Sequence, residues 1–208
     1  MVFTTTGHSP FQCGTSTVTD YDMNVYNTVA MGNQCWTREN IRTTHYMDGT
    51  PISHSDVSSN TEAYRHLPDN DMSLVDPYGY LYNWQAVMHG ESSSTTNPSG
   101  VQGPCPEGWH VPSYSELEQL YQYLHDNTAL HCDGSDTAQA SALASSVGWS
   151  SSSVMCSPGY APINNNASGF SILPPGIFHN DAAVNLGHSS SFWSATLYQA
   201  NKPYSKHK

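Results

Sequence analysis

The sequence predicts an α+β fold, in which a single loop-rich domain contains two main helices, a small twisted antiparallel sheet and stabilising disulfides. Three observations predict this class. A capped amphipathic helix begins after Ser113, residues 18–29 alternate as in a short hairpin, and five cysteines are spread over 208 residues. A chain of this length can bury one sizeable core. We therefore expect one domain at residues 13–208, preceded by an extended tail at residues 1–12.

The first elements of the domain are expected to be strands. Apolar and polar side chains alternate on both sides of residues 22–24, which predicts a short hairpin. Residues 32–36 form the next corner, and residues 37–44 should be a strand or a short helix. Residues 48–76 are rich in turn-forming residues, so they should be irregular.

A capping box predicts the first main helix at residues 114–126. Ser113 is followed three positions later by Glu116, and in this pairing each side chain accepts a hydrogen bond from the backbone N–H of the other. The apolar residues behind the cap recur with helical spacing, at Leu117, Leu120, Tyr121 and Leu124. The second main helix is expected at residues 136–147, where several alanines allow close packing.

Aromatic residues are expected to form much of the core. Prolines flank the pair Gly108 and Trp109, so the backbone is held extended while the indole is directed inward. Four aromatic residues crowd residues 78–84, which predicts a core element that ends in a helical turn near residue 88. The expected core tryptophans are Trp36, Trp84, Trp109, Trp149 and Trp193.

Charge and hydropathy argue against two classes of partner. Six Lys and Arg stand against 17 Asp and Glu, for a formal net charge of −11. Because nucleic acids and anionic membranes attract clustered cations, neither is expected as a partner. No apolar run approaches the roughly 18 residues of a membrane span. Residues 1–12 also lack the regions of a signal peptide, so we expect any leader to lie outside this sequence.

Five blocks closely resemble the Fibrobacter succinogenes major paralogous domain family and span roughly residues 13–196. These blocks are TVTDYDMNVYNTVAMGNQCWTRENIRTTHYMDGTPI, YGYLYNWQAVMHG, NPSGVQGPCPEGWHVPSYSELEQL, NNNASGFSILPPG and FWSAT. The family is similar in fold to C-type lectins and to formylglycine-generating enzymes. The resemblance therefore implies a C-type-lectin-like domain of a bacterial protein that is extracellular or attached to the cell surface.

The chain departs from the family pattern at its end. Members of the family continue past the Phe-Trp-Ser-Ala-Thr block to a terminal strand that contains a cysteine. The residues after Thr196 are basic and unlike that pattern. The resemblance therefore predicts that the chain is truncated and that the last strands of the sheet are absent.

The cysteines lie outside any paired C-x-x-C zinc pattern, which favours disulfides and an oxidising compartment. Cys13 and Cys35 could bridge across the first hairpin, and Cys132 and Cys156 flank the second predicted helix. This pairing leaves Cys105 unpaired. The family resemblance implies a partner for Cys105 in the absent terminal strand, and the alternative is a buried free thiol that packs as a small hydrophobe.

The sequence predicts neither a metal site nor a cofactor nor catalysis. Its histidines are scattered without a metal-binding spacing, and the oxygen-rich loop at residues 69–71 is interpreted as a solvated acidic loop rather than a calcium site. No nucleophile elbow or phosphate-binding loop is present in the sequence. The cysteines are expected to be oxidised, so they are poor candidates for nucleophiles.

We therefore expect a non-catalytic extracellular binding or adhesion module for a glycan or protein ligand. Its candidate binding face consists of loops at residues 164–166, 180–188 and 198–204, because irregular loops on a fixed core commonly carry recognition.

The alternative is a structural subunit of a self-assembling extracellular filament. A sheet that lacks its last strand has an open edge, and such edges accept a strand from another chain. Five residues of the tail have the β propensity to fill this edge in a neighbouring copy, namely Val2, Phe3, Thr4, Thr5 and Thr6. Head-to-tail addition of this kind does not close, so it builds a filament.

Overall fold

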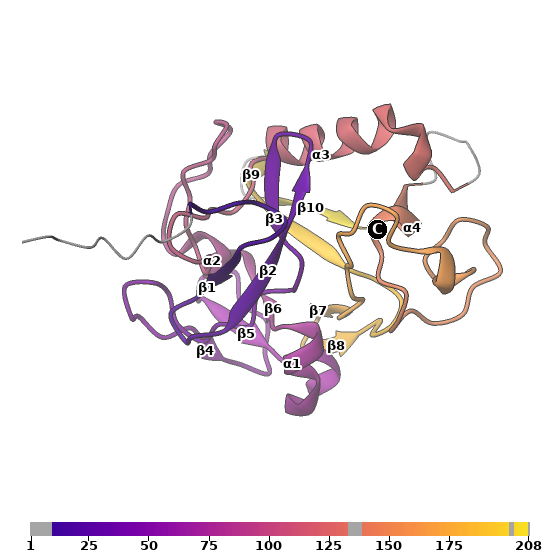
Figure 1. The fold of residues 1–208 in the computed structure, drawn as a ribbon. Coiled ribbons are helices and arrows are strands. Elements are labelled where there is room, and N and C mark those ends of the chain that lie inside the picture. Colours follow the sequence, from indigo (N-terminus) through magenta and orange to yellow (C-terminus); the bar gives the residue numbers. More distant parts are fainter. Residues whose placement is uncertain (1–9, 133–138, 200–201, 208) are drawn as a thin grey trace, which may run out of the picture.

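The computed structural model describes residues 10–132, 139–199 and 202–207, with side chains described up to residue 197. The fold combines α and β structure, as predicted, in small sheets, a few helices and two disulfides (Figure 1). The strands are β1 (Thr17–Thr19), β2 (Val25–Met31), β3 (Gln34–Thr37), β4 (Ser53–His54), β5 (Tyr64–His66), β6 (Leu81–Tyr82), β7 (Ile177–His179), β8 (Ala182–Val184), β9 (Ser191–Gln199) and β10 (Lys202–His207). The α-helices are α1 (Val75–Tyr78), α2 (Trp84–Met88), α3 (Tyr114–Asp126) and α4 (Ala140–Leu143). Short 3₁₀ helices are η1 (Pro68–Asn70), η2 (Met72–Leu74), η3 (Thr128–Leu130) and η4 (Pro162–Asn164).

The strands form several small sheets instead of the single sheet that the sequence predicts. Their orders are β1-β2-β3, β4-β5-β6, β7-β8 and β10-β9. The pairs are antiparallel except for β4 and β5, which run parallel. Residues 48–76, expected to be irregular, contain β4, β5, η1, η2 and the start of α1.

The first hairpin forms where the sequence predicts it. β1 and β2 pair antiparallel around the turn, in which the carboxylate of Asp20 accepts a hydrogen bond from the N–H of Asn24 at 2.9 Å. A second turn at residues 32 and 33 leads into β3. The disulfide between Cys13 and Cys35 then ties β3 to the segment before β1, as expected.

The prediction of a strand or short helix at residues 37–44 is wrong beyond Thr37, because the chain is irregular from there. Side-chain hydrogen bonds take the place of a strand ladder. The carboxylate of Asp22 accepts hydrogen bonds from the N–H of Thr44 at 2.5 Å and from the hydroxyl of Thr43 at 3.0 Å. The segment is therefore held to the turn of the first hairpin at one end, while at its other end the N–H of Arg38 donates to the carbonyl of Asn27 in β2 at 2.9 Å.

The start and the apolar face of α3 agree with the prediction. The hydroxyl of Ser113 accepts a hydrogen bond from the N–H of Glu116 at 3.3 Å, and the Glu116 carboxylate accepts one from the N–H of Ser113 at 2.9 Å. Of the predicted apolar residues of the helix, Leu117, Leu120 and Leu124 are buried and Tyr121 is half-buried. The local sequence is sufficient here because both the cap and the stripe are short-range features.

The second helix is much shorter than predicted. α4 has four residues, so the helix predicted at residues 136–147 is wrong in its second half, and residues 136–138 lie outside the described part. The reason is a strand-like pairing with Ile172. The N–H of Ile172 donates to the carbonyl of Leu143, and the N–H of Ser145 donates to the carbonyl of Ile172, each at 2.8 Å. This tertiary contact overrides the helix propensity of the alanines.

The chain forms a further strand after Thr196, where the family resemblance predicts that the last strands are absent. β9 continues to Gln199, and β10 runs antiparallel to it. Pro203 cannot donate a ladder hydrogen bond, and it lies where the register of the pair is interrupted. The expectation that this part of the chain adds no strand is therefore wrong.

Separate clusters of buried apolar side chains form the core. The first joins β2, α3 and the residues around Ile172 and consists of Val29, Met31, Leu120, Leu124, Leu143, Phe170 and Ile172. The second joins α2 to β9 and consists of Val87, Met88, Val101, Val111 and Ala195. The third is formed by Tyr46, Ile52 and Ala86. Figure 1 shows α3 along one side of the molecule, across the end of the β2–β3 hairpin.

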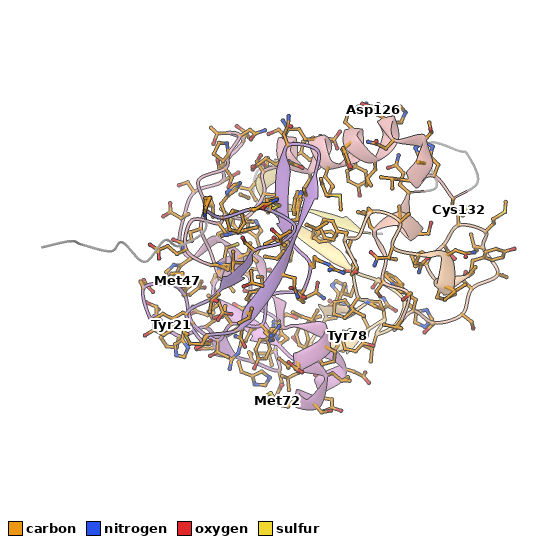
Figure 2. The ribbon with its side chains drawn as sticks, in the orientation of Figure 1. Tyr21, Met47, Met72, Tyr78, Asp126 and Cys132 are labelled. Atoms are coloured by element: carbon orange, nitrogen blue, oxygen red, sulfur yellow. A yellow bond between two sulfur atoms is a disulfide. The ribbon has the colours of Figure 1, made fainter. Side chains whose placement is uncertain are left out.

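The second disulfide lies in the loop-rich part of the chain after α3. Cys132 bonds with Cys156, which is the pairing that the sequence favours. Figure 2 shows Cys132 beyond the end of α3, which is marked by Asp126, at the outer side of the molecule. Within the described residues, none of the helices combines the length and the apolar character that a membrane span requires.

Candidate functional site

A cavity of about 1930 Å³ opens among the described residues. Ten aromatic side chains line it: Phe11, Trp36, Tyr80, Tyr82, Trp84, Trp109, Phe170, Phe178, Phe192 and Trp193. Pockets for single small ligands usually measure about 300–1000 Å³. The cavity is therefore large enough for a segment of a polymer, and we call it the aromatic cavity below.

Two tryptophans connect opposite parts of the cavity wall. The indole N–H of Trp193 in β9 donates to the carbonyl of Tyr82 in β6 at 2.7 Å. The indole N–H of Trp84 in α2 donates to the carbonyl of Ser194 in β9 at 3.3 Å. Both rings are half-buried and pack against the second core cluster. Because their donors are satisfied internally, these rings contribute apolar surface to the wall.

The other predicted core tryptophans are also half-buried. Trp36 and Trp149 pack against the first core cluster. Trp109 meets Phe11 edge to face, with ring centroids 6.1 Å apart. Phe11 belongs to the predicted tail, so the last residues of that segment pack on the domain. The five tryptophans thus lie at the margins of the core, where four of them face the aromatic cavity.

Carboxylates on the cavity wall are already hydrogen-bonded within the protein. Glu39 accepts hydrogen bonds from the backbone and side-chain N–H groups of Asn27, at 2.7 and 2.6 Å. Glu116 is almost buried, and its Oε1 lies 2.7 Å from Nε2 of His110. These contacts fix the carboxylates in place, and they make both groups structural parts of the wall.

Cys105 also lines the aromatic cavity and is free. It packs against the second core cluster, which agrees with the interpretation of this residue as a small hydrophobe. Burial raises the pKa of the Cys105 thiol to about 12. The thiol is therefore protonated at neutral pH, and a protonated thiol is a poor nucleophile.

Strands from four different sheets border the aromatic cavity. Residues of β3, β6, β7 and β9 all contribute to its lining. Among the described residues, β3 and β6 are outer strands of their sheets, and β7 and β9 each pair with one neighbour. Each of these four strands therefore has one edge that pairs with no other strand in the described part of the chain.

A second group of polar side chains surrounds Asp22. Its Oδ1 lies 2.7 Å from Nδ1 of His45, and the hydroxyl of Thr44 contacts both that nitrogen and Oδ2 of Asp22. Burial alone would raise the pKa of Asp22, but hydrogen bonds from Thr44, His45 and Thr43 lower it to about 2. A catalytic triad needs the carboxylate and the nucleophile on opposite imidazole nitrogens. Here both contact Nδ1, so the group is a structural network.

The acidic loop at residues 69–71 makes local contacts. Asp71 accepts hydrogen bonds from the N–H and the hydroxyl of Ser73, both at 2.8 Å. Within the described residues, no three His, Cys, Asp or Glu side chains are grouped as ligands for a metal ion.

The structure uses the predicted binding loops in different ways. The side chain of Asn165 donates to the carbonyls of Ser145 and Pro158, each at 2.9 Å, so it is turned inward. Asn180 lines the aromatic cavity. The side chains of residues 198–204 and the strand-addition residues 2–6 lie outside the described part of the chain.

The aromatic cavity is not predicted from the sequence. Residues 78–84 are expected to lie in the core, and only the crowding of aromatic residues there could have indicated a half-buried aromatic surface. His66 and Phe178 went unnoticed because they come from distant parts of the chain and meet only in the folded protein.

Comparison with known proteins identifies the family. The model of the Fibrobacter succinogenes major domain matches residues 29–207, a range that includes the strands β9 and β10 as well as the aromatic cavity's tryptophans. No curated protein and no solved structure matches the chain. Because the matched range covers most of its length, the chain belongs to the Fibrobacter succinogenes major domain family.

Proposed function

We propose that this protein is a non-catalytic extracellular binding or adhesion module whose ligand occupies the aromatic cavity. The observation that carries the proposal is the set of ten aromatic side chains around one large cavity. Half-buried aromatic rings supply rigid contact area at a low cost in conformational entropy, and they are the usual anchors of recognition surfaces. A monomeric protein rarely keeps so much apolar surface without a use for it.

An extracellular location and a C-type-lectin-like fold are parts of the same proposal. Two disulfides support an oxidising compartment. A capped helix directly after a Gly-Trp turn, small sheets and long irregular segments support the lectin-like arrangement.

A binding role is preferred to catalysis because the candidate reactive groups are not arranged for it. Burial raises the pKa of the Cys105 thiol to about 12, so this thiol is protonated at neutral pH. In a catalytic triad the carboxylate and the nucleophile lie on opposite imidazole nitrogens, whereas Asp22 and the hydroxyl of Thr44 both contact Nδ1 of His45.

The test compares two aromatic substitutions for binding to a glycan array and to a panel of extracellular matrix proteins. Trp109→Ala removes a half-buried ring from the cavity wall, and Tyr160→Ala removes a half-exposed ring that does not line it. We expect the wild type to bind, Trp109→Ala to lose at least about tenfold in affinity and Tyr160→Ala to bind as the wild type. Wild-type silence on both panels and toward a synthetic peptide of residues 1–9, or equal loss in both variants, would contradict the proposal.

A second candidate function is that of a structural subunit of an extracellular filament. The observation that favours it is the presence of strands from four sheets around the cavity, because open strand edges accept further strands. Electron microscopy of the purified protein separates the two candidates, since fibres support the filament and dispersed particles support ligand binding.

A further inference from the structure

We infer that the aromatic cavity accepts an extended polypeptide segment, residues 2–6 of a second copy of this chain, as an added β-strand. The inference rests on the proposed function, in which the cavity binds a ligand, and it names that ligand. It also unites the two candidate functions, because the bound segment would link one copy to the next.

The volume of the cavity is sufficient for an extended chain segment. At about 3.3 Å per residue, five residues in a strand extend roughly 17 Å. A segment of this kind needs a long hollow with hydrogen-bonding groups along it and apolar pockets for alternate side chains. The cavity volume of about 1930 Å³ is roughly twice the upper end for small ligands.

The cavity wall supplies both kinds of group. β3 is an outer strand among the described residues and lines the cavity, whereas the carbonyls of Tyr82 in β6 and Ser194 in β9 already accept hydrogen bonds from tryptophan N–H groups. The rings of Trp36, beside the first core cluster, and Trp84, beside the second, also line the cavity. An added strand would therefore pair with a sheet edge and bury these rings.

The chemistry of the tail fits this wall. Val2 and Phe3 are apolar with high β propensity, and Thr4, Thr5 and Thr6 are β-branched. Residues 1–12 contain no Asp or Glu, whereas the whole chain has a formal net charge of −11. The segment thus brings no negative charge to an acidic partner. Screening of the remaining repulsion between copies should make assembly stronger at higher salt.

The tail is joined to the domain beside the aromatic cavity. Phe11 lines the cavity and packs on Trp109, so the segment that precedes it starts at the cavity wall. Pro10 disfavours helical backbone at Ser9 and so favours an extended chain there. The mass of cross-linked products distinguishes the cavity of a neighbouring copy from the chain's own cavity.

The first experiment measures assembly of the full chain by sedimentation velocity over a range of protein and salt concentrations. Phe3→Asp places a charge in the proposed strand, and Ser9→Asp places the same charge outside it, as a matched control. We expect the wild type and Ser9→Asp to form oligomers whose size increases with salt. Phe3→Asp should remain monomeric. A wild type that stays monomeric, or variants that assemble alike, would overturn the inference.

The second experiment uses Cys105 as a reporter inside the cavity. Thr4→Cys, Thr5→Cys and Thr6→Cys are each oxidised with a copper(II) complex, which accepts the two electrons that two thiols release, with two protons, as the disulfide forms. A strand alternates its faces, so Thr5→Cys should differ from the other two in cross-linking efficiency. We expect a ladder of multimers on non-reducing gels that disappears with Cys105→Ser. Products of monomer mass, or equal efficiency at all three positions, each overturn the inference.

These results separate the inference from the proposed function. If Trp109→Ala abolishes binding of a glycan while Phe3→Asp changes neither binding nor oligomeric state, the cavity is a binding site but its ligand is not the tail. If the synthetic peptide MVFTTTGHS binds to Phe3→Asp protein and Trp109→Ala weakens this binding at least about tenfold, both stand.

Discussion

The imidazole of His66 lies flat against the ring of Phe178, with ring centroids 3.7 Å apart and ring planes within 3° of parallel. His66 belongs to β5 and Phe178 to β7, so the stack joins two sheets at the wall of the aromatic cavity. Nδ1 of His66 lies 2.6 Å from the carbonyl oxygen of Ser55, which can only accept, so this nitrogen carries the proton. Burial lowers the pKa of His66, although the hydrogen bond to Ser55 opposes this shift.

The His66 stack predicts a loss of stability in mild acid. Because the pKa of His66 is lower in the folded protein than its unfolded value of about 6.5, the unfolded chain binds the proton first. The stability that neutral His66 contributes to the fold is therefore complete above pH 6.5 and is lost as the pH falls below it. We expect the free energy of unfolding by urea to fall between about pH 7 and pH 5.

The variant His66→Asn retains an N–H donor near the position of Nδ1 and cannot be protonated. It should flatten this pH dependence, whereas His179→Asn, at an exposed residue of β7, should leave it unchanged. An identical pH dependence in His66→Asn and the wild type would rule out this role for His66.

Asp22 should stabilise the fold in its ionised form. Hydrogen bonds lower its pKa to about 2, below its ordinary value of 3.8, so the stability that the ionised carboxylate contributes is present above about pH 4 and is lost as the pH falls through 2. Asp22→Asn should reduce the free energy of unfolding at pH 7 by roughly 1–2 kcal/mol, after allowance for solvent screening of this partly exposed group. Chemical denaturation at several pH values checks this, and the deficit should shrink as the pH approaches 2. A constant deficit at all pH values would mean that the charge is not the cause.

Glu116 should matter more than its partner in the capping box. Beyond capping α3, its carboxylate accepts a hydrogen bond from the N–H of Ser99 at 3.2 Å and contacts His110, so it also fastens the loop before the helix. Ser113→Ala should cost about 1 kcal/mol of folding free energy, as N-cap losses usually do. Glu116→Ala should cost roughly 2–3 kcal/mol, because it leaves buried donors unsatisfied. Denaturant midpoints for the two variants give the comparison. Equal losses of folding free energy would mean that Glu116 only caps α3 and does not also hold the loop before it.

Gly103 should tolerate no side chain, whereas Gly100 should tolerate one. Both have positive φ angles, +53° and +77°, so alanine is strained at either position. A Cβ at Gly103 would lie 2.1 Å from the carbonyl oxygen of Val87, but at Gly100 it would meet nothing within 4 Å. Gly100→Ala should cost about 1 kcal/mol, and Gly103→Ala should cost roughly 1–3 kcal/mol more. Thermal unfolding of both variants tests this, and similar melting temperatures would show that the backbone of α2 yields easily.

Features that depend on neighbours in the chain could be predicted from the sequence. The cap and apolar face of α3, the hairpin between β1 and β2 and the helical turn of α2 each depend on residues a few positions apart. The two disulfides could also be predicted, because Cys13 and Cys35 lie across the first predicted hairpin and Cys132 and Cys156 flank the second predicted helix. Family membership followed from blocks of sequence in order, and the family match agrees with it.

Features that depend on contacts between distant parts of the chain could not be predicted from the sequence. Pairing with Ile172 ends α4 early, and the bonds from Thr43 and Thr44 to Asp22 keep residues 38–44 irregular. In both places the local propensity favours a regular element by only a few tenths of a kcal/mol per residue. A long-range hydrogen bond has a larger effect than this difference.

By itself, the amino-acid sequence determined the family, the cysteine pairs, the acidic character and the tryptophan-rich composition of this protein. Only the tertiary structure decided that four of those tryptophans line a cavity among strands of four sheets, with Cys105 beside them. The physical reason is that side-chain burial is set by what packs on both sides of a residue. For half-buried aromatic rings, those neighbours come from segments that are far apart in the chain.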